Sequence, residues 1–471
     1  MEKVTYAESK GPTFGKRHVQ AILQFFSIVL EMASRACVSL SIIAMTDSTT
    51  SSNPNIPTYD WSNTNVILSS FYWGYIALQL PAAQLVHSYG IKWFLFAAML
   101  VNSLSMTLIP TFAALLGSTG VMICRAVQGV SQGFFYPSMQ TMLGRWAPEE
   151  ERSRMSMLVY TGSAIGTILC GPINGYICES HYGWPGTFYL FGGLGFVWCI
   201  SWFFFGFSTP ASHPTISAEE RLYIEKSLGQ DKGVENVPTP WTSILTSMPF
   251  YSVVLATVGI TFGAAFLSSD MPTYLKNVVG YSTKTNGILS SVPTIAGIAS
   301  NFIFALVSDF IVTRNYVSKL NSRKIFHVIG SYGPSTCMLI LAYLPKSDVN
   351  LTMTYLIING ALASSQHYGV VINNLDISPR FAGVIGGFSS TISSSMSLCA
   401  PLLVQFLVTD ETNVTQWRTI FIIAAGWYFV GATFFVIFAS ADVQPWDSGK
   451  IKKNAVEKIK KESVTSFKSN V

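Results

Sequence analysis

Apolar runs of about 20 residues recur along the whole chain, separated by shorter polar segments. A run of that length crosses the hydrocarbon of a bilayer as a helix. Inside lipid the backbone must satisfy its own hydrogen bonds, so each run is predicted to be helical. The sequence therefore predicts an all-α membrane protein with 12 transmembrane helices, near 19–45, 64–86, 93–113, 117–142, 156–177, 185–207, 248–271, 286–308, 326–344, 353–372, 383–407 and 418–440.

The basic residues divide unevenly between the segments that connect these spans. If residues 1–18 are cytoplasmic, 23 of the 29 Lys and Arg residues fall in cytoplasmic segments, and only Lys276, Lys284 and Lys346 fall in outside loops. Cytoplasmic loops of membrane proteins carry such an excess of positive charge. Both termini are therefore predicted to be cytoplasmic. The net charge of +5 follows this pattern and does not indicate nucleic-acid binding.

A polar connector divides the spans into two sets of six. It contains a helix start, with Ser217 at the N-cap and Glu220 three residues later. Two bundles of helices around a central site are typical of secondary transporters. The predicted parts are a cytoplasmic N-terminal tail (1–18), a six-helix bundle (19–207), a cytoplasmic loop (208–247), a second six-helix bundle (248–440) and a cytoplasmic C-terminal tail (441–471).

Two arginines, Arg35 and Arg125, lie inside predicted spans. A charge at membrane depth costs at least about 2.5–3.5 kcal/mol, so it normally faces a partner or a water-filled cavity. The planar guanidinium group can hold a carboxylate or phosphate with two hydrogen bonds, which lysine cannot do. Both arginines are therefore predicted to bind an anion.

Polar residues follow Arg125 at helical spacing. Gln128, Gln132 and Tyr136 come three, seven and eleven residues later, which places them on one face of a single helix. That face combines a fixed cation with amides and a phenol, a set suited to binding an oxyanion. The alternative is a structural role, in which Arg125 bonds to carbonyl groups of a neighbouring helix.

Three further residues are candidates for binding a coupling ion. Glu31 precedes Arg35 by four residues, the favourable order for an ion pair in a helix. It is predicted either to respond to a cation or proton, or to form a static pair that only makes Arg35 insertable. Asp270 ends the seventh span, where an exposed helix-end acid is the simpler interpretation. His367 interrupts the tenth span, where it either lines a cavity or bonds to another helix.

Several stretches resemble solute carrier family 17, the anion:cation symporters of the major facilitator superfamily. They include Cys124-Arg-Ala-Val-Gln-Gly-Val-Ser-Gln-Gly, Gly144-Arg-Trp-Ala-Pro-Glu-Glu-Glu-Arg-Ser-Arg, Phe71-Tyr-Trp-Gly-Tyr and Asn374-Leu-Asp-Ile-Ser-Pro. The resemblance covers about residues 18–442. It implies the superfamily fold of two six-helix bundles and a small anionic substrate. Sialin-like members carry glutamates at the positions where this chain has Gln128 and Gln132. In this respect the chain is more similar to the type I sodium/phosphate cotransporters.

The resemblance also implies a role for one loop. The segment that contains Asp309 and Arg314 is similar to a charged cytoplasmic loop of the superfamily, so these two residues are expected to act in gating. The alternative is an ordinary polar loop. Asn350 and Asn413 each begin an Asn-X-Thr tripeptide in a predicted outside loop and are glycosylation candidates, Asn413 the better one.

Motifs for catalysis, nucleotide binding or a metal site are absent from the sequence. Transport energy would therefore come from an ion gradient, with no cofactor and no resident metal. The leading prediction is a sodium-coupled symporter of phosphate or an organic anion that works by alternating access. Its expected partners are a small anionic substrate and the lipid bilayer, and it is expected to function as a monomer. The second is a proton-coupled carrier of acidic sugars or carboxylates, and the third is an anion-sensing receptor that does not transport. We expect the plasma membrane, with lysosomal or vesicular membranes as alternatives.

Overall fold

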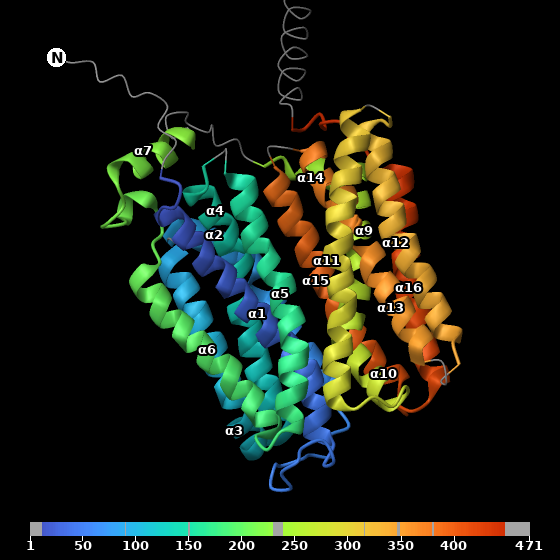
Figure 1. Ribbon diagram of the computed structural model, residues 1–471. Coiled ribbons are helices and arrows are strands. Elements are labelled where there is room, and N and C mark those ends of the chain that lie inside the picture. Colours follow the sequence, from blue (N-terminus) through green and yellow to red (C-terminus); the bar gives the residue numbers. More distant parts are fainter. Residues whose placement is uncertain are drawn as a thin grey trace, which may run out of the picture.

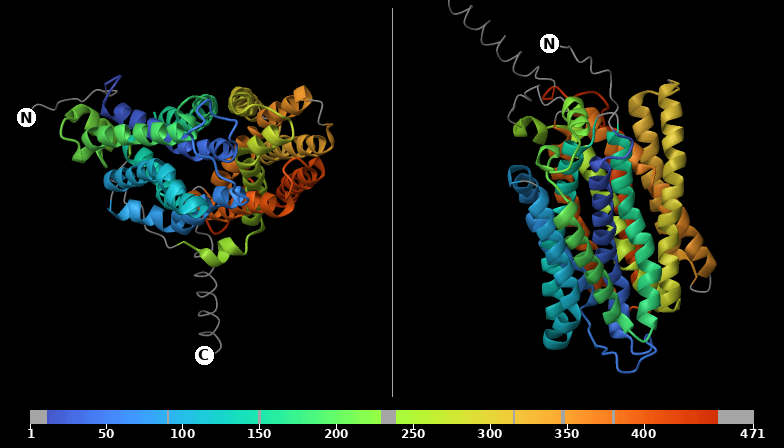
Figure 2. Two further views of the ribbon diagram at one scale, coloured as in Figure 1. Left: turned by 90° about the horizontal axis from the view of Figure 1, so that it is seen from below. Right: turned by 60° about the vertical axis from the view of Figure 1, so that its left-hand side comes forward.

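The computed structural model describes residues 12–89, 91–148, 151–228, 239–314, 316–345, 349–378 and 381–447. All regular secondary structure in these ranges is helical. The helices of the first half of the chain, blue to green in Figure 1, gather beside those of the second half, yellow to red. Figure 2 shows the same two groups from below. The chain is therefore an all-α membrane protein built from two helical bundles.

The first bundle contains α1 (Lys16–Thr46), α2 (Thr64–Tyr89), α3 (Ile91–Gln132), α4 (Phe135–Trp146), α5 (Arg152–Glu179) and α6 (Gly183–Phe205). The helix α3 reverses at Gly117, whose positive φ of 60° suits glycine. Gln128 bonds to Met106 and Gln132 bonds to Asn102, so the two parts of α3 lie antiparallel. The spans predicted at 93–113 and 117–142 are therefore the two parts of α3, the second continued by α4.

The second bundle contains α9 (Met248–Ser269), α10 (Met271–Asn277), α11 (Thr283–Thr313), α12 (Lys319–Tyr343), α13 (Val349–Ala363), η2 (His367–Val371), α14 (Ile372–Ile377), α15 (Ala382–Leu407) and α16 (Val414–Phe438). Each of the predicted spans coincides with one helix or with consecutive helices. Among the described residues, nine helical stretches are long and apolar enough by themselves to cross a bilayer.

The connector carries η1 (Pro210–Ser212), α7 (Ala218–Ser227) and α8 (Trp241–Leu245). The helix α7 begins as predicted, since the Ser217 hydroxyl accepts a hydrogen bond from the Glu220 amide at 3.2 Å. The Glu220 carboxylate in turn accepts bonds from the backbone amides of Lys16 and Arg17, at 3.0 and 3.1 Å. A carboxylate at this helix start is also favoured by the helix dipole. The connector is thus fastened to the first turn of α1.

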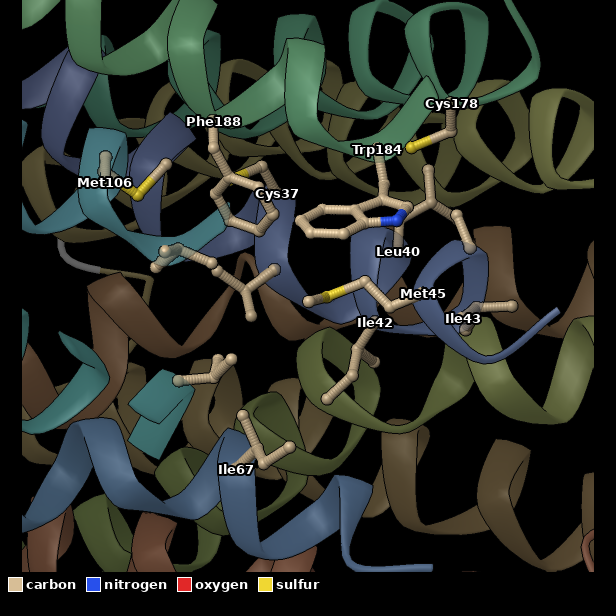
Figure 3. Packing of buried hydrophobic residues seen from close by; sticks show 14 of the residues in the cluster. Cys37, Leu40, Ile42, Ile43, Met45, Ile67, Met106, Cys178, Trp184 and Phe188 are labelled. Atoms are coloured by element: carbon tan, nitrogen blue, oxygen red, sulfur yellow. The ribbon is translucent and has the colours of Figure 1, made fainter. Parts of the chain in front are cut away.

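Large side chains fill the interior of the first bundle. Trp184 and Phe188 of α6 pack against Cys37 and Met45 of α1 in one buried cluster (Figure 3). The Trp184 indole also donates a hydrogen bond of 2.8 Å to the carbonyl of Pro57. Helices in lipid associate through such packing and hydrogen bonding rather than through the hydrophobic effect. This core fixes α1, which carries half of the candidate site.

The two bundles meet along α5 with α11 and along α2 with α15. At Gly171 of α5 an added Cβ would lie 2.3 Å from the carbonyl oxygen of Gly287 in α11, so these backbones touch. Nearby, the Ser291 hydroxyl of α11 donates a bond of 3.0 Å to the carbonyl of Ile168 in α5. We call the end of the molecule that carries α10 the α10 end, and the opposite end, with α7, the α7 end (Figure 1).

Polar contacts between the bundles gather toward the α10 end. The Lys276 ammonium of α10 pairs with Asp47, which follows α1, and bonds to Thr50 at 3.2 Å. Further bonds join the Lys284 amide to Glu179 at 2.6 Å and the Gln405 side chain to the Ser62 carbonyl at 2.8 Å. Among hydrogen bonds between two described residues, all those that join the bundles lie in this half of the molecule.

A close approach of α2 to α3 gives a test of the fold. A Cβ at Gly129 would sit 1.9 Å from the carbonyl oxygen of Phe71, whereas a Cβ at Gly144 of α4 would meet nothing within 4 Å. Gly129→Ala should therefore lower the free energy of unfolding by about 1–3 kcal/mol through overpacking. Gly144→Ala, the matched control, should leave it unchanged or raise it slightly, because alanine is the better helix former. Thermal unfolding followed by tryptophan fluorescence checks both, and equal melting temperatures would contradict this packing.

Candidate functional site

Arg35 lies in the middle of α1 and turns toward α2. Its Nη2 donates a hydrogen bond of 3.1 Å to the Tyr72 hydroxyl. Its Cζ lies 4.7, 5.2 and 5.5 Å from the ring centres of Phe71, Tyr72 and Tyr75. A cation over aromatic faces is attracted by their quadrupoles, most strongly where water is excluded. The half-buried guanidinium group is therefore held by aromatic rings rather than by an acid.

Arg125 lies in the second part of α3 and is only 3% exposed. Its Nη1 donates a short bond of 2.6 Å to Oε1 of Gln128, one turn further on. Its Cζ lies 4.9 Å from the centre of the Phe71 ring, the same ring that Arg35 contacts. Its Nε has no hydrogen-bond partner. The two predicted arginines are thus brought together around one phenylalanine, and neither forms an ion pair with a described carboxylate within 4.0 Å.

The aromatic cluster of Phe71, Tyr72 and Tyr75 reaches the boundary between the bundles. All three rings are buried, and Leu398 of α15 packs against them from the second bundle. The arginines therefore lie in the first bundle at the surface where the second bundle meets it. This is the position expected of a site that is exposed or closed when the bundles move.

The two glutamines have different partners. Gln128 joins Arg125 and also donates 3.3 Å bonds to the Ser34 carbonyl and the Met106 sulfur. Gln132 turns away from the arginines, because its Nε2 donates to the Glu31 carbonyl at 3.3 Å and to Asn102 Oδ1 at 3.0 Å. Gln128 orients the cation, and Gln132 holds α1 against the first part of α3. Gln128 thus lies at the arginine pair and Gln132 does not bond to it, and anion binding by either glutamine stays a prediction.

Tyr136 belongs to a different helix from Arg125. The helix α3 ends at Gln132, and α4 begins at Phe135, so the single helical face that the spacing predicts is broken between them. Gly133 lies at the break. Glycine loses more conformational entropy in a helix than other residues do, so it weakens the helix at this point. Tyr136 is half-buried and still lies within electrostatic range of Glu31, Tyr75 and Arg35. The break therefore leaves it beside the site.

Glu31 does not form the predicted ion pair with Arg35. The Glu31 side chain is fully buried, and both carboxylate oxygens lack a hydrogen-bond partner. Arg35 acts on it electrostatically, but the two groups are not within 4.0 Å. The aromatic rings of α2 hold Arg35 instead. The static pair is thus absent from this conformation.

Asp270 is buried, not the exposed helix-end acid of the simpler interpretation. It sits between α9 and α10 with no exposed surface, and both of its carboxylate oxygens lack a partner. Glu411 lies within electrostatic range and is bonded by the Asn277 side chain. Burial raises the pKa of Glu411. This acidic pair belongs to the second bundle at the α10 end, away from the arginines.

His367 begins η2, a turn of π-helix, and its side chain is exposed. Its neighbours bond to α12: the Ser365 hydroxyl donates to the Phe326 carbonyl at 2.9 Å, and the Gln366 amide donates to the Gly330 carbonyl. The neighbours of His367 therefore form hydrogen bonds to another helix, which was the alternative to lining a cavity. His327 of α12, in contrast, is fully buried and packs on Phe435 with ring centres 4.4 Å apart.

The predicted loop residues are only partly described. The Asp309 side chain lies outside the described part of the chain, while Arg314 caps α11 and is exposed with its Cζ 6.0 Å from the Phe310 ring. Asn413 is the N-cap of α16, where its Oδ1 accepts a bond from the Thr415 amide at 2.9 Å. Asn350 is exposed near the start of α13. Gating and glycosylation therefore stay predictions.

Sequence reasoning missed the aromatic partners of the arginines. Phe71, Tyr72 and Tyr75 follow the one-turn spacing of a helical face, while Trp73 between them is 46% exposed. That periodicity was the available signal. Two cations, aromatic walls and no paired acid make a site that can bind an anion. Among the described residues, no group of three or more His, Cys, Asp or Glu side chains is placed to hold a metal ion.

Comparison with known proteins gives matches over nearly the whole chain. Residues 24–375 match the model of the Major Facilitator Superfamily. A putative inorganic phosphate cotransporter of Drosophila melanogaster is 34% identical, covering 92% of this chain and 87% of that protein. Human sialin is 30% identical (93% and 92% covered), and mouse sodium-dependent phosphate transport protein 1 is 30% identical (91% and 95%).

A solved structure shares the fold. It is a bacterial homolog of the human lysosomal transporter Spinster, described as inward-facing and unoccupied. The TM-score is 0.64 at 14% sequence identity, and the match covers 91% of this chain and 99% of that one. At this identity the likeness establishes the arrangement of the helices.

The bond between Arg35 and Tyr72 can be tested within the cluster. Tyr72→Phe removes a hydrogen bond to a charged group, of the kind that contributes about 1.5–3 kcal/mol, and keeps the ring. Its melting temperature should fall. Tyr75→Phe is the matched control, because the Tyr75 ring contacts Arg35 without a hydrogen bond between them. Thermal unfolding in detergent measures both, and an equal loss in the two variants would argue against the bond.

Proposed function

Because the chain belongs to the Major Facilitator Superfamily, within the anion transporters of solute carrier family 17, we propose that its arginine pair binds the transported anion and that sodium drives uptake. The family consists of transporters, so the chain is a multi-pass integral membrane protein and not an enzyme. Inorganic phosphate is the proposed substrate, with other small organic anions next. The plasma membrane is the proposed location.

The observation that carries this proposal is the pair of guanidinium groups around Phe71. Two cations in an apolar bundle repel one another, and neither has a carboxylate within ion-pair distance among the described residues. An oxyanion between them would supply the missing negative charge. It would also accept from Arg125 Nε, which has no partner otherwise. The site is thus complementary to phosphate or carboxylate oxygens.

Two features favour sodium over protons. The second part of α3 carries the neutral residues Gln128 and Gln132, so it offers no carboxylate to take up a proton. Two of the similar proteins named above carry phosphate transport in their names, and one of them is sodium-dependent by name. The similarity to sialin keeps a proton-coupled carrier of acidic sugars or carboxylates as the alternative.

Alternating access would follow from movement of one bundle against the other. The contacts that join the bundles lie in the half with α10, so this end is the closed one in the proposal. With the predicted topology the α10 end faces outside, and the conformation corresponds to an inward-facing state. Substrate would then exchange with the cytoplasm through the α7 end.

The transport prediction uses phosphate uptake into cells that express the chain, with sodium present or replaced by choline. Wild type should accumulate phosphate only with sodium. Arg125→Ala should lose at least about 100-fold in uptake, because removing one buried charged partner costs about 3–5 kcal/mol. Arg221→Ala is the matched control: Arg221 lies on α7, is exposed, and pairs only with Glu225 among described residues at 2.8 Å.

The other outcomes separate the alternatives. Uptake driven by a pH gradient without sodium would favour the proton-coupled carrier. Binding without accumulation would favour a receptor. No phosphate uptake in either medium, at normal surface expression, would reject phosphate and leave organic anions as the next substrates to assay.

A second prediction concerns the closure of the α10 end. Burial alone would raise the pKa of Asp47, but hydrogen bonds from Lys276 and Thr49 outweigh it and lower the pKa to about 2. A carboxylate with a lowered pKa stabilises the folded contact at every pH above its unfolded value, and this stabilisation is lost as the pH falls toward 2. The contact should therefore stay closed throughout the physiological range. Removing the charge with Asp47→Asn should open it at neutral pH.

Cysteine labelling measures this opening. Ser291 is 3% exposed and faces α5, so Ser291→Cys reports on separation of the bundles. Its reaction with a membrane-impermeant thiol reagent, relative to the unfolded protein at the same pH, should be slow and constant between about pH 5 and pH 8. Asp47→Asn should accelerate it severalfold. A pH-dependent rate in this range, or no acceleration, would contradict the role of the pair.

A further inference from the structure

Buried polar groups without partners follow one face of α1. Gln24, Ser27 and Glu31 are spaced by three and four residues, so their side chains share a face of the helix. Each is at most 1% exposed. The amide of Gln24, the hydroxyl of Ser27 and both carboxylate oxygens of Glu31 lack hydrogen-bond partners. This row leads from the middle of the molecule toward the α7 end, and Arg35 lies one turn beyond Glu31.

A fourth group comes from α3. Gln132 has no exposed surface, and its Nε2 donates to the Glu31 carbonyl, which places the amide beside the backbone of Glu31. Its Oε1 has no partner. Gln132 therefore brings an unpartnered oxygen to the turn of α1 that carries Glu31, and no N–H or O–H group of a described residue donates to it or to the Glu31 carboxylate.

Leaving such groups buried and unpaired is costly. An unsatisfied buried polar group costs about 1–3 kcal/mol, and an unpaired charge costs more. Every oxygen named here can accept or coordinate, and hard cations are bound by carboxylate, amide and hydroxyl oxygens. A proton would satisfy one carboxylate oxygen, whereas a bound cation engages several oxygens together. A single carboxylate suits a monovalent ion, since divalent ions usually recruit more charge.

We propose that Glu31, the Ser27 hydroxyl and Gln132 Oε1 form a sodium site in the first bundle, one helical turn from the arginine pair. Gln24 provides the next oxygen along the route to the α7 end. The proposal rests on the proposed function, because it identifies where the coupling ion binds. Asp270, the other acid that is buried without a hydrogen-bond partner among the described residues, lies in the second bundle, away from the arginines.

The charges explain why anion and cation would bind together. With Glu31 ionised, as a bound cation would require, Arg35, Arg125 and Glu31 together carry one excess positive charge. A phosphate dianion reverses that excess, and one sodium ion at Glu31 restores neutrality in an apolar surrounding. Each ligand therefore raises the affinity for the other, a coupling that must be reciprocal. An anion that binds without sodium leaves a buried negative charge.

Binding of radioactive sodium to the purified full-length protein tests the site without any transported anion. Sodium is supplied as gluconate, and unlabelled sodium or choline is the competitor. Wild type should bind sodium that only sodium displaces. Glu31→Gln should abolish this binding, and Ser27→Ala, which keeps every charge, should weaken it by about tenfold. Glu225→Gln is the matched control, because Glu225 lies on α7 outside both bundles.

The outcomes are exclusive. Sodium binding that survives Glu31→Gln and Ser27→Ala, or that is lost in Asp270→Asn, would overturn the proposal. If the wild-type protein binds no sodium and a pH gradient drives anion uptake, the proposed sodium site is overturned in favour of a proton. If Glu31→Gln does not elute as a monodisperse protein, Ser27→Ala decides. Phosphate binding measured on the same preparations separates the two claims, since sodium binding without phosphate binding rejects only the substrate.

Discussion

The burial of two guanidinium groups inside an apolar bundle is the constraint on which the rest of the structure depends. A buried cation must be compensated, and here aromatic faces, one phenol and one amide provide the compensation. That requires Phe71 to approach both Arg35 and Arg125. The approach is possible because Gly129 lets the backbone of α2 lie directly against α3. Packing and electrostatics are therefore parts of one arrangement.

Compensation of this kind is incomplete. Aromatic rings and an amide stabilise a cation without neutralising it, so the region keeps a positive potential that an acid in contact would have removed. Glu31, the carboxylate that acts electrostatically on Arg35, is separated from it and has no donor of its own among the described residues. A cationic region without a neutralising acid, next to a carboxylate without a hydrogen-bond donor, is unfavourable for stability. The same arrangement favours the binding of an anion and a cation together.

Much of this was predictable from local sequence. Length and hydropathy predict the helices, the spacing of Ser217 and Glu220 predicts the start of α7, and buried arginines predict an anion site. What failed depends on contacts between helices. The spacing of Glu31 and Arg35 permits an ion pair, but the rings of α2 hold the arginine elsewhere. Asp270 looks like an exposed helix end until α10 and the segment near Glu411 cover it. Gly133 is a sequence signal for the helix break before Tyr136. The regular spacing from Arg125 to Tyr136 nevertheless suggested one continuous helix.

The contact of Gly171 with Gly287 affects how readily one bundle can move against the other. Where two helices meet through side chains, sliding one over the other requires those side chains to change rotamers together. At this point backbone lies on backbone, so the two glycines contribute no side chain that has to change rotamer. We therefore expect the bundles to rotate about this contact with little side-chain rearrangement at the two glycines, while the Lys276–Asp47 ion pair at the α10 end favours the closed state. In this arrangement the glycine contact bears on how fast the bundles exchange between states, and the ion pair bears on which state is populated.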